Sequence, residues 1–130
     1  MKGVLHHIEI YVADLKRTTE FWGWFLGELG YEIYQKWNIG ISYKLADTYL
    51  VFVQTEEKYL NVKYHRKRVG LNHIAFHAGS REMVDEMERK LKKMKISLLY
   101  SDRYPFAGGK EHYALFFEDP NRIKVELVAP

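Results

Sequence analysis

The sequence predicts an α+β fold in which the order strand, helix, three strands occurs twice. Two segments repeat one another around a histidine, LHHIEIYVADL at residues 5–15 and LNHIAFHAGSR at residues 71–81. His7 and His73 hold the same place in the two copies. In each copy an alternating apolar pattern, typical of a strand, gives way to the spacing of an amphipathic helix. Such self-similarity indicates a fold built from two related modules.

The first copy begins with a strand and continues into an amphipathic helix. Apolar and polar residues alternate over residues 4–12, as in a strand with one buried face. Asp14 is a suitable N-cap for a helix over residues 15–29, and Gly30 is a suitable stop. The apolar face of this helix comprises Leu15, Phe21, Trp22, Phe25, Leu26 and Leu29. Three further strands are predicted over residues 31–37, 39–45 and 48–54.

The second copy has the same order. A strand is predicted over residues 71–78, and Ser80 is the expected N-cap of a helix that reaches about Met94. The apolar side of this helix comprises Met83, Met87, Leu91 and Met94. Strands are expected near residues 96–100, 112–117 and 123–128, with a turn at residues 119–121. Residues 100–111 contain Pro105 and two glycines, which predicts a flexible loop bordering a pocket.

Length and composition favour one domain made of two modules. The chain has 130 residues, of which 47% are hydrophobic, enough for a single core. We assign residues 1–130 to one domain, with module one at residues 1–54, a linker at 55–70 and module two at 71–130.

Several classes of protein are disfavoured by composition. The absence of cysteine excludes disulfides and thiolate metal sites, and the chain shows neither a signal-peptide centre nor a membrane span. The expected location is the cytoplasm. The net charge of +3 is mild, and its positive residues gather at 63–68 and 90–95. Solvated surface explains these clusters better than a nucleic-acid footprint, although the first cluster could attract an anionic substrate.

One face of the predicted sheets is rich in histidine and carboxylate. The face covered by the helices is expected to bury Ile8, Ile10, Ile74, Phe76, Val125 and Leu127. The opposite face then carries His7, Glu9, His73, His77 and Glu126. Polar residues on one sheet face often mean only contact with water, but here histidines recur at equivalent positions of the repeat.

The chain resembles the vicinal-oxygen-chelate superfamily, which includes glyoxalase I, extradiol dioxygenases, fosfomycin-resistance enzymes and bleomycin-resistance proteins. The resemblance rests on HIEIYVADL before a helix with the pair FW, on GELGYE, on GLNHIAFHA and on FFEDPNRIKVELVAP. It covers nearly all of the chain. It implies two βαβββ modules that form an open, cup-shaped mixed-sheet barrel with the helices outside, and it implies a homodimer.

The resemblance implies a set of metal ligands, His7, His73 and Glu126. The fourth family position falls in TYLVFVQ at residues 48–54, where no histidine or glutamate occurs and Gln54 is at best a weak candidate. Two histidines and one carboxylate leave coordination positions open for substrate, water or dioxygen. Such ligands suit Mn, Fe, Zn, Ni or Co, among which the sequence does not choose.

Other polar and aromatic residues have open interpretations. Glu9 is a possible general base or a carboxylate at the rim, and His77 is a possible proton shuttle or a solvated histidine. Residues expected to line the pocket are Trp37, Tyr43, Tyr49 and His112, and Phe116 fits either a pocket wall or core packing.

Two functions remain in competition. The first is a metal-dependent lyase, isomerase or dioxygenase that acts on a small oxygenated substrate. The second is a metal-free, antibiotic-binding protein of the bleomycin-resistance type. Neither involves nucleic acid or a membrane.

Overall fold

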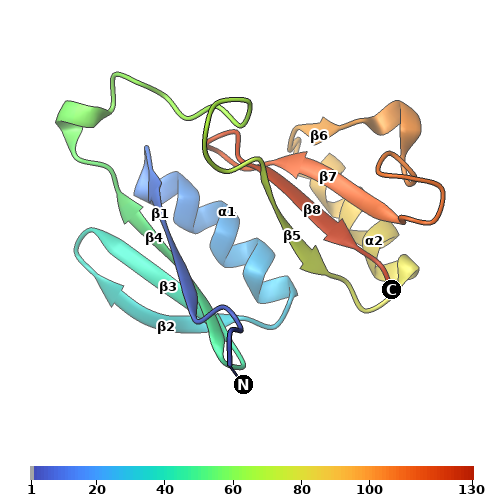
Figure 1. Cartoon of the computed structure of the whole chain (residues 1–130), viewed down its shortest axis with the longest axis horizontal. Helices are drawn as coiled ribbons and strands as arrows, with labels where there is room; N and C mark the ends of the chain where they lie inside the picture. Colours follow the sequence, from blue (N-terminus) through green and yellow to red (C-terminus); the bar gives the residue numbers. More distant parts are fainter. Residues whose placement is uncertain (1) are drawn as a thin grey trace. The chain divides into compact units, whose positions relative to one another are not determined.

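The structure is a computed structural model that describes residues 2–130. It falls into two compact units, the first ending at Lys63 and the second running from Tyr64 to Pro130. Each unit contains a four-stranded mixed sheet with one long helix against it (Figure 1). The predicted α+β class and the twice-repeated order of one strand, a helix and three strands are therefore confirmed.

The first unit contains β1 (His7–Val12), α1 (Leu15–Glu28), β2 (Glu32–Trp37), β3 (Gly40–Leu45), β4 (Thr48–Gln54) and the short η1 (Glu57–Tyr59). Its strands lie in the order β1-β4-β3-β2. β1 is parallel to β4, whereas the other neighbours are antiparallel. The first strand therefore pairs with the last strand of its unit.

Local signals set the ends of α1. The Asp14 side chain accepts a hydrogen bond from the backbone N–H of Arg17 at 3.1 Å, as an N-cap does. Gly30 follows the helix with a φ of +94°, which glycine adopts without strain. The buried face of the helix holds Thr18, Phe21, Trp22, Phe25 and Leu26.

Gln54 stabilises the start of the same helix and is not aimed at a metal. Its Oε1 accepts from the backbone N–H of Leu15 at 2.8 Å, and its Nε2 donates to the carbonyl of Ala13 at 2.9 Å. Both ends of the amide are thus used within the first unit. The structure gives Gln54 this different role because β4 ends beside the N-terminus of α1 and its last side chain satisfies helix backbone there.

The second unit contains β5 (His73–His77), α2 (Arg81–Lys93), β6 (Leu98–Leu99), the short η2 (Ser101–Arg103), β7 (Ala114–Glu118) and β8 (Lys124–Val128). Its strand order is β5-β8-β7-β6, with β5 parallel to β8. The topology of the first unit is thus repeated. β6 is shorter than predicted because Lys95 and Tyr100 both adopt the left-handed conformation, with φ of 58°, and end the extended backbone on either side.

The helix α2 begins at its predicted cap. Ser80 accepts from the backbone N–H of Met83 at 3.1 Å. Val84, Met87 and Leu91 form the buried face. Met94 is 42% exposed, contrary to prediction, because it is the C-cap residue and the chain turns away immediately after it.

Burial under the helices differs between central and edge strands. Val125 and Leu127 on the central strand β8 are fully buried as predicted, but Ile8 on β1 is 37% exposed because β1 is an edge strand. Tyr43 was expected in a pocket but is buried, with its hydroxyl bonded to Thr19 of α1.

Among the described residues, no helix combines the length and apolarity that a bilayer crossing requires.

Part of the predicted linker belongs to the second unit. Residues 64–70 fall within it, and the guanidinium of Arg66 lies 2.6 Å from the carboxylate of Glu118 on β7. Both side chains are largely shielded from water, so the pair fastens this segment to the sheet. Arg66 is therefore not part of a solvated basic cluster.

Candidate functional site

Four side chains lie next to one another on one face of the second sheet. In register, His73 of β5 lies opposite Lys124 of β8, and Phe116 of β7 lies opposite Glu126. Paired residues point to the same face and residues two apart on a strand share it, so these four side chains leave the same face. The other face of β8 is buried. The polar face thus carries the site.

Glu126 is the centre of this face. It is only 4% exposed, and its Oε1 lies 3.0 Å from Nε2 of His73. Its second oxygen, Oε2, contacts Nε2 of His112. His73 is oriented from its other side by Asn72, whose Oδ1 lies 2.7 Å from Nδ1 of the imidazole. A buried carboxylate is costly unless it is paired, and here two imidazoles satisfy it.

A cavity of about 440 Å³ opens beside this carboxylate. It lies wholly within the second unit and is lined by His73, Tyr100, Arg103, Ala107, Gly108, His112, Phe116, Lys124 and Glu126. Aromatic rings, two cations and one buried carboxylate therefore surround a space large enough for a small organic molecule.

A glycine allows the loop before β7 to pack against His112. A Cβ atom built on Gly108 would lie 2.6 Å from Cδ2 of that imidazole, closer than real side chains come. Any larger residue at position 108 would displace the ring from Glu126. The loop is thus shaped to hold His112 in place.

Asp85 of α2 fastens the same loop. Its Oδ1 accepts hydrogen bonds from the hydroxyls of Tyr104 and Tyr113, the latter at 2.6 Å. These bonds lower the pKa of Asp85, while burial and the bond to the carboxylate raise the pKa of Tyr104. The loop predicted to be flexible is therefore attached to the helix at Tyr104 and, just past its end, at Tyr113.

Replacing Asp85 by asparagine is expected to destabilise the protein by about 1–2 kcal/mol, since two hydrogen bonds lose their charged acceptor. The native pKa of Asp85 is lowered, so its contribution is present above the unfolded value of about 3.9 and is lost as the pH falls through the native pKa. Urea unfolding at several pH values should show a constant deficit from pH 5 to 8 that begins to shrink as the pH falls below about 4 and vanishes only below the native pKa.

Glu86→Gln is the matched control for that substitution. Glu86 lies on the same helix with its side chain 60% exposed and pairs only with Lys90 among described residues. Its replacement should change stability by less than about 0.5 kcal/mol. Equal losses in the two variants would show that Asp85 does not fasten the loop.

The structure joins two of the predicted site residues, both of them in the second unit. His73 and Glu126 are in contact, whereas the side chains of Glu9 and His77 are exposed and make no hydrogen bond or ion pair with another described residue. His7 lies in the first unit, where its ring stacks on Tyr49 with centroids 4.8 Å apart.

Lys124 and His112 were not predicted as polar groups of the site. Lys124 could have been found, because it lies two residues before Glu126 on the last strand and therefore shares its face. The contact between His112 and Glu126 could not, because it depends on the loop attached to Asp85. His112 was expected only as a pocket wall.

Two donor atoms of the His73–Glu126 pair have the spacing of neighbouring ligands in an octahedral metal site. In such a site, bonds of about 2.1 Å that meet at a right angle separate two donor atoms by about 3 Å. Nε2 of His73 and Oε1 of Glu126 have this spacing, at 3.0 Å. Among the described residues, however, no group of three His, Asp or Glu side chains is arranged to hold a metal ion. The second unit thus offers two compatible ligands of the three expected.

Comparison with known proteins places these features in a family. A sequence model of the glyoxalase/bleomycin resistance protein/dioxygenase superfamily matches residues 6–116. The uncharacterised protein YqjT of Bacillus subtilis (strain 168) is 61% identical over 126 residues, covering 97% of this chain and 98% of its own length. The match spans both units.

Solved structures show the same fold. The crystal structure of a candidate glyoxalase from Bacillus halodurans is 62% identical, covers 99% of this chain and 97% of its own, and has a TM-score of 0.98. More distant is lactoylglutathione lyase from Agrobacterium tumefaciens, with 19% identity, 98% and 93% coverage and a TM-score of 0.68. The fosfomycin resistance protein FosX from Listeria monocytogenes has 24% identity, 100% and 95% coverage and a TM-score of 0.72.

Proposed function

Because the chain belongs to the glyoxalase/bleomycin resistance protein/dioxygenase superfamily, we propose that it is a metalloenzyme that acts on a small oxygenated organic molecule. Members of this superfamily often use divalent metals and bind small molecules. The proposed chemistry is that of a lyase, isomerase or dioxygenase. A homodimer, common in the superfamily, is part of the proposal.

The observation that carries the proposal is the position of Glu126. This carboxylate is 4% exposed, lies at a cavity and has Oε1 at 3.0 Å from Nε2 of His73. A fold does not need a buried charge in the middle of a sheet, because an apolar residue at that point would cost less. Such a group is retained where it has chemistry to perform.

Each proposed residue has a distinct role. His73 and Glu126 hold the metal, together with His7 as the third ligand implied by the family resemblance. When bound, a divalent metal supplies Lewis-acid polarisation of a substrate oxygen. Phe116 forms an apolar wall of the cavity, which limits water around the substrate. Glu9 and His77 are assigned to proton transfer.

A second candidate function is metal-free binding of a small molecule, as in bleomycin-resistance proteins. The two imidazoles bonded to Glu126 favour it, because they satisfy the carboxylate without a metal. A cationic ligand is disfavoured because the positively charged Arg103 and Lys124 line the cavity and would repel it. The two functions differ in whether a metal is required.

Metal analysis tests the proposal. Protein purified without chelator should contain one transition metal ion per chain, and His73→Ala should contain less than about a tenth of that amount. Adding Mn²⁺, Fe²⁺, Zn²⁺, Ni²⁺ or Co²⁺ to stripped wild type should raise the melting temperature through binding to the native state.

His77→Ala is the control on the same strand. Its imidazole touches no described residue of the site, so this variant should retain the metal while losing turnover if His77 moves a proton. Wild-type protein that contains no metal and shows no thermal shift would refute the metalloenzyme and leave metal-free binding.

A further inference from the structure

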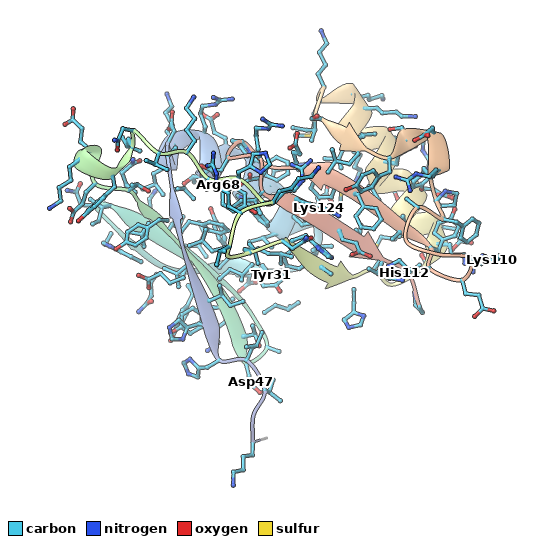
Figure 2. The ribbon with its side chains drawn as sticks, turned by 45° about the horizontal axis from the view of Figure 1, so that its top comes forward. Tyr31, Asp47, Arg68, Lys110, His112 and Lys124 are labelled. Atoms are coloured by element: carbon cyan, nitrogen blue, oxygen red, sulfur yellow. The ribbon has the colours of Figure 1, made fainter. Side chains whose placement is uncertain are left out.

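The cavity of the second unit has a positively charged end. Lys124, at the start of β8, and Arg103, at the end of η2, both line it. Figure 2 shows Lys124 and His112 near opposite ends of the sheet, with Glu126 between them in the register. The cavity therefore has cations at one end and the Glu126 carboxylate farther along.

Lys124 is held over aromatic rings. Its Nζ lies 4.9 Å from the centre of the Tyr100 ring and 5.1 Å from that of Phe116, and it donates to the Tyr100 hydroxyl at 3.1 Å. Cation–π contacts of this kind fix an ammonium group without neutralising it. Lys124 is thus held at the cavity by two rings and a hydroxyl group.

The carboxylate nearest to Lys124 in the sheet is already occupied. Glu118 is its direct partner on β7, but Oε2 of Glu118 lies 2.6 Å from Nη1 of Arg66 and 3.4 Å from Nε of Arg122. Among the described residues, Lys124 has no carboxylate within ion-pair distance. Two arginines therefore leave this lysine available for another anion.

Arg103 brings a second positive charge to the same ring. Its Cζ lies 5.0 Å from the centre of Tyr100, and within residues 2–130 it too has no acidic partner. Both cations line the cavity, so an anion bound at this end of it meets two positive charges.

We propose that this end of the cavity binds the anionic group of a small organic acid, a carboxylate or a phosphate, through Lys124, Arg103 and the Tyr100 hydroxyl. Lys124 and Glu126 are two residues apart on one strand, so their backbones lie about 7 Å apart. An acid bound at Lys124 would therefore extend its next oxygen-bearing carbon toward the His73–Glu126 pair. The inference names the substrate class of the proposed enzyme and rests on that function.

The anion subsite can be tested on its own because its residues need no metal. ¹⁵N-labelled, chelator-treated full-length protein is titrated separately with inorganic phosphate and with glycolate, and amide shifts give each Kd. Shifts should centre on Tyr100, Arg103 and Lys124. Tighter binding of phosphate would assign phosphate esters, and tighter binding of glycolate would assign hydroxy acids.

Charge-removing variants decide whether the named residues bind the anion. Lys124→Met keeps length and ring contact and should weaken binding of the preferred anion about tenfold, as should Arg103→Gln, whereas Lys124→Arg should stay within about threefold of wild type. Lys110→Met, on the loop outside the cavity lining, removes the same charge as a control and should bind like wild type (Figure 2).

Two outcomes would overturn the subsite: no saturable shift with either anion, or equal losses in Lys124→Met and Lys110→Met. Failure of the proposed metalloenzyme function would give a different result. The purified protein would contain no metal, while the anion titration would still shift the amide signals of Lys124 and Arg103.

Discussion

Glu126→Gln is expected to lower the affinity for a divalent metal by at least about 100-fold while leaving the fold intact. The amide has the size of the carboxylate and can still bond to His73 and His112, so the packing of β8 survives. It lacks the negative charge that a metal ligand supplies. Calorimetric titration of stripped protein with Zn²⁺ or Mn²⁺, together with circular dichroism, measures both effects.

Glu111→Gln is the control for this substitution. Glu111 is exposed in the loop next to His112, so its replacement changes the net charge equally without entering the cavity lining. Metal affinity should stay within about twofold of wild type. A Glu126→Gln protein that binds metal as tightly as Glu111→Gln would remove Glu126 from the ligand set.

Trp22→Ala is expected to destabilise the first unit by about 3–5 kcal/mol. Trp22 is fully buried, and its ring centre lies 5.0 Å from that of Phe52 on β4 and 5.9 Å from that of Phe25. Truncation removes the side chain that joins α1 to the middle of the sheet and leaves a cavity. Urea unfolding followed by circular dichroism measures the loss.

Trp37→Ala provides the comparison within the same unit. Trp37 lies on the edge strand β2 and is 42% exposed, so its truncation should cost less than half as much. Similar midpoints for the two variants would mean that α1 does not depend on Trp22 for its attachment to the sheet.

Local signals made the fold predictable. Asp14 and Ser80 begin their helices because a side-chain oxygen within three residues satisfies a free backbone N–H, and such a signal is visible in the sequence. Gln54 satisfies the N–H of Leu15 across 39 positions of sequence, so its role depended on the parallel pairing of β1 with β4. Long-range contacts of this kind have no local signature.

The candidate site was likewise predictable except where it depends on contacts between residues far apart in the sequence. The pairing of His73 with Glu126 follows from strand alternation together with the family resemblance. The contact of His112 with Glu126 required a loop whose path is set by Asp85, Tyr104 and Tyr113, three residues with no distinctive spacing. The availability of Lys124 likewise depended on Arg66, which lies far away in the sequence and occupies Glu118.

The parallel pairing of first and last strands in each unit governs when the protein can fold during synthesis. The first sheet can close once residue 54 has left the ribosome, since β4 then meets β1. In the second unit β5 must wait for residues 124–128, the strand that lies between β5 and β7. Until then β5 presents an unpaired edge, which favours misassociation of nascent chains. In each unit the first strand therefore stays unpaired until the last strand of that unit has been made.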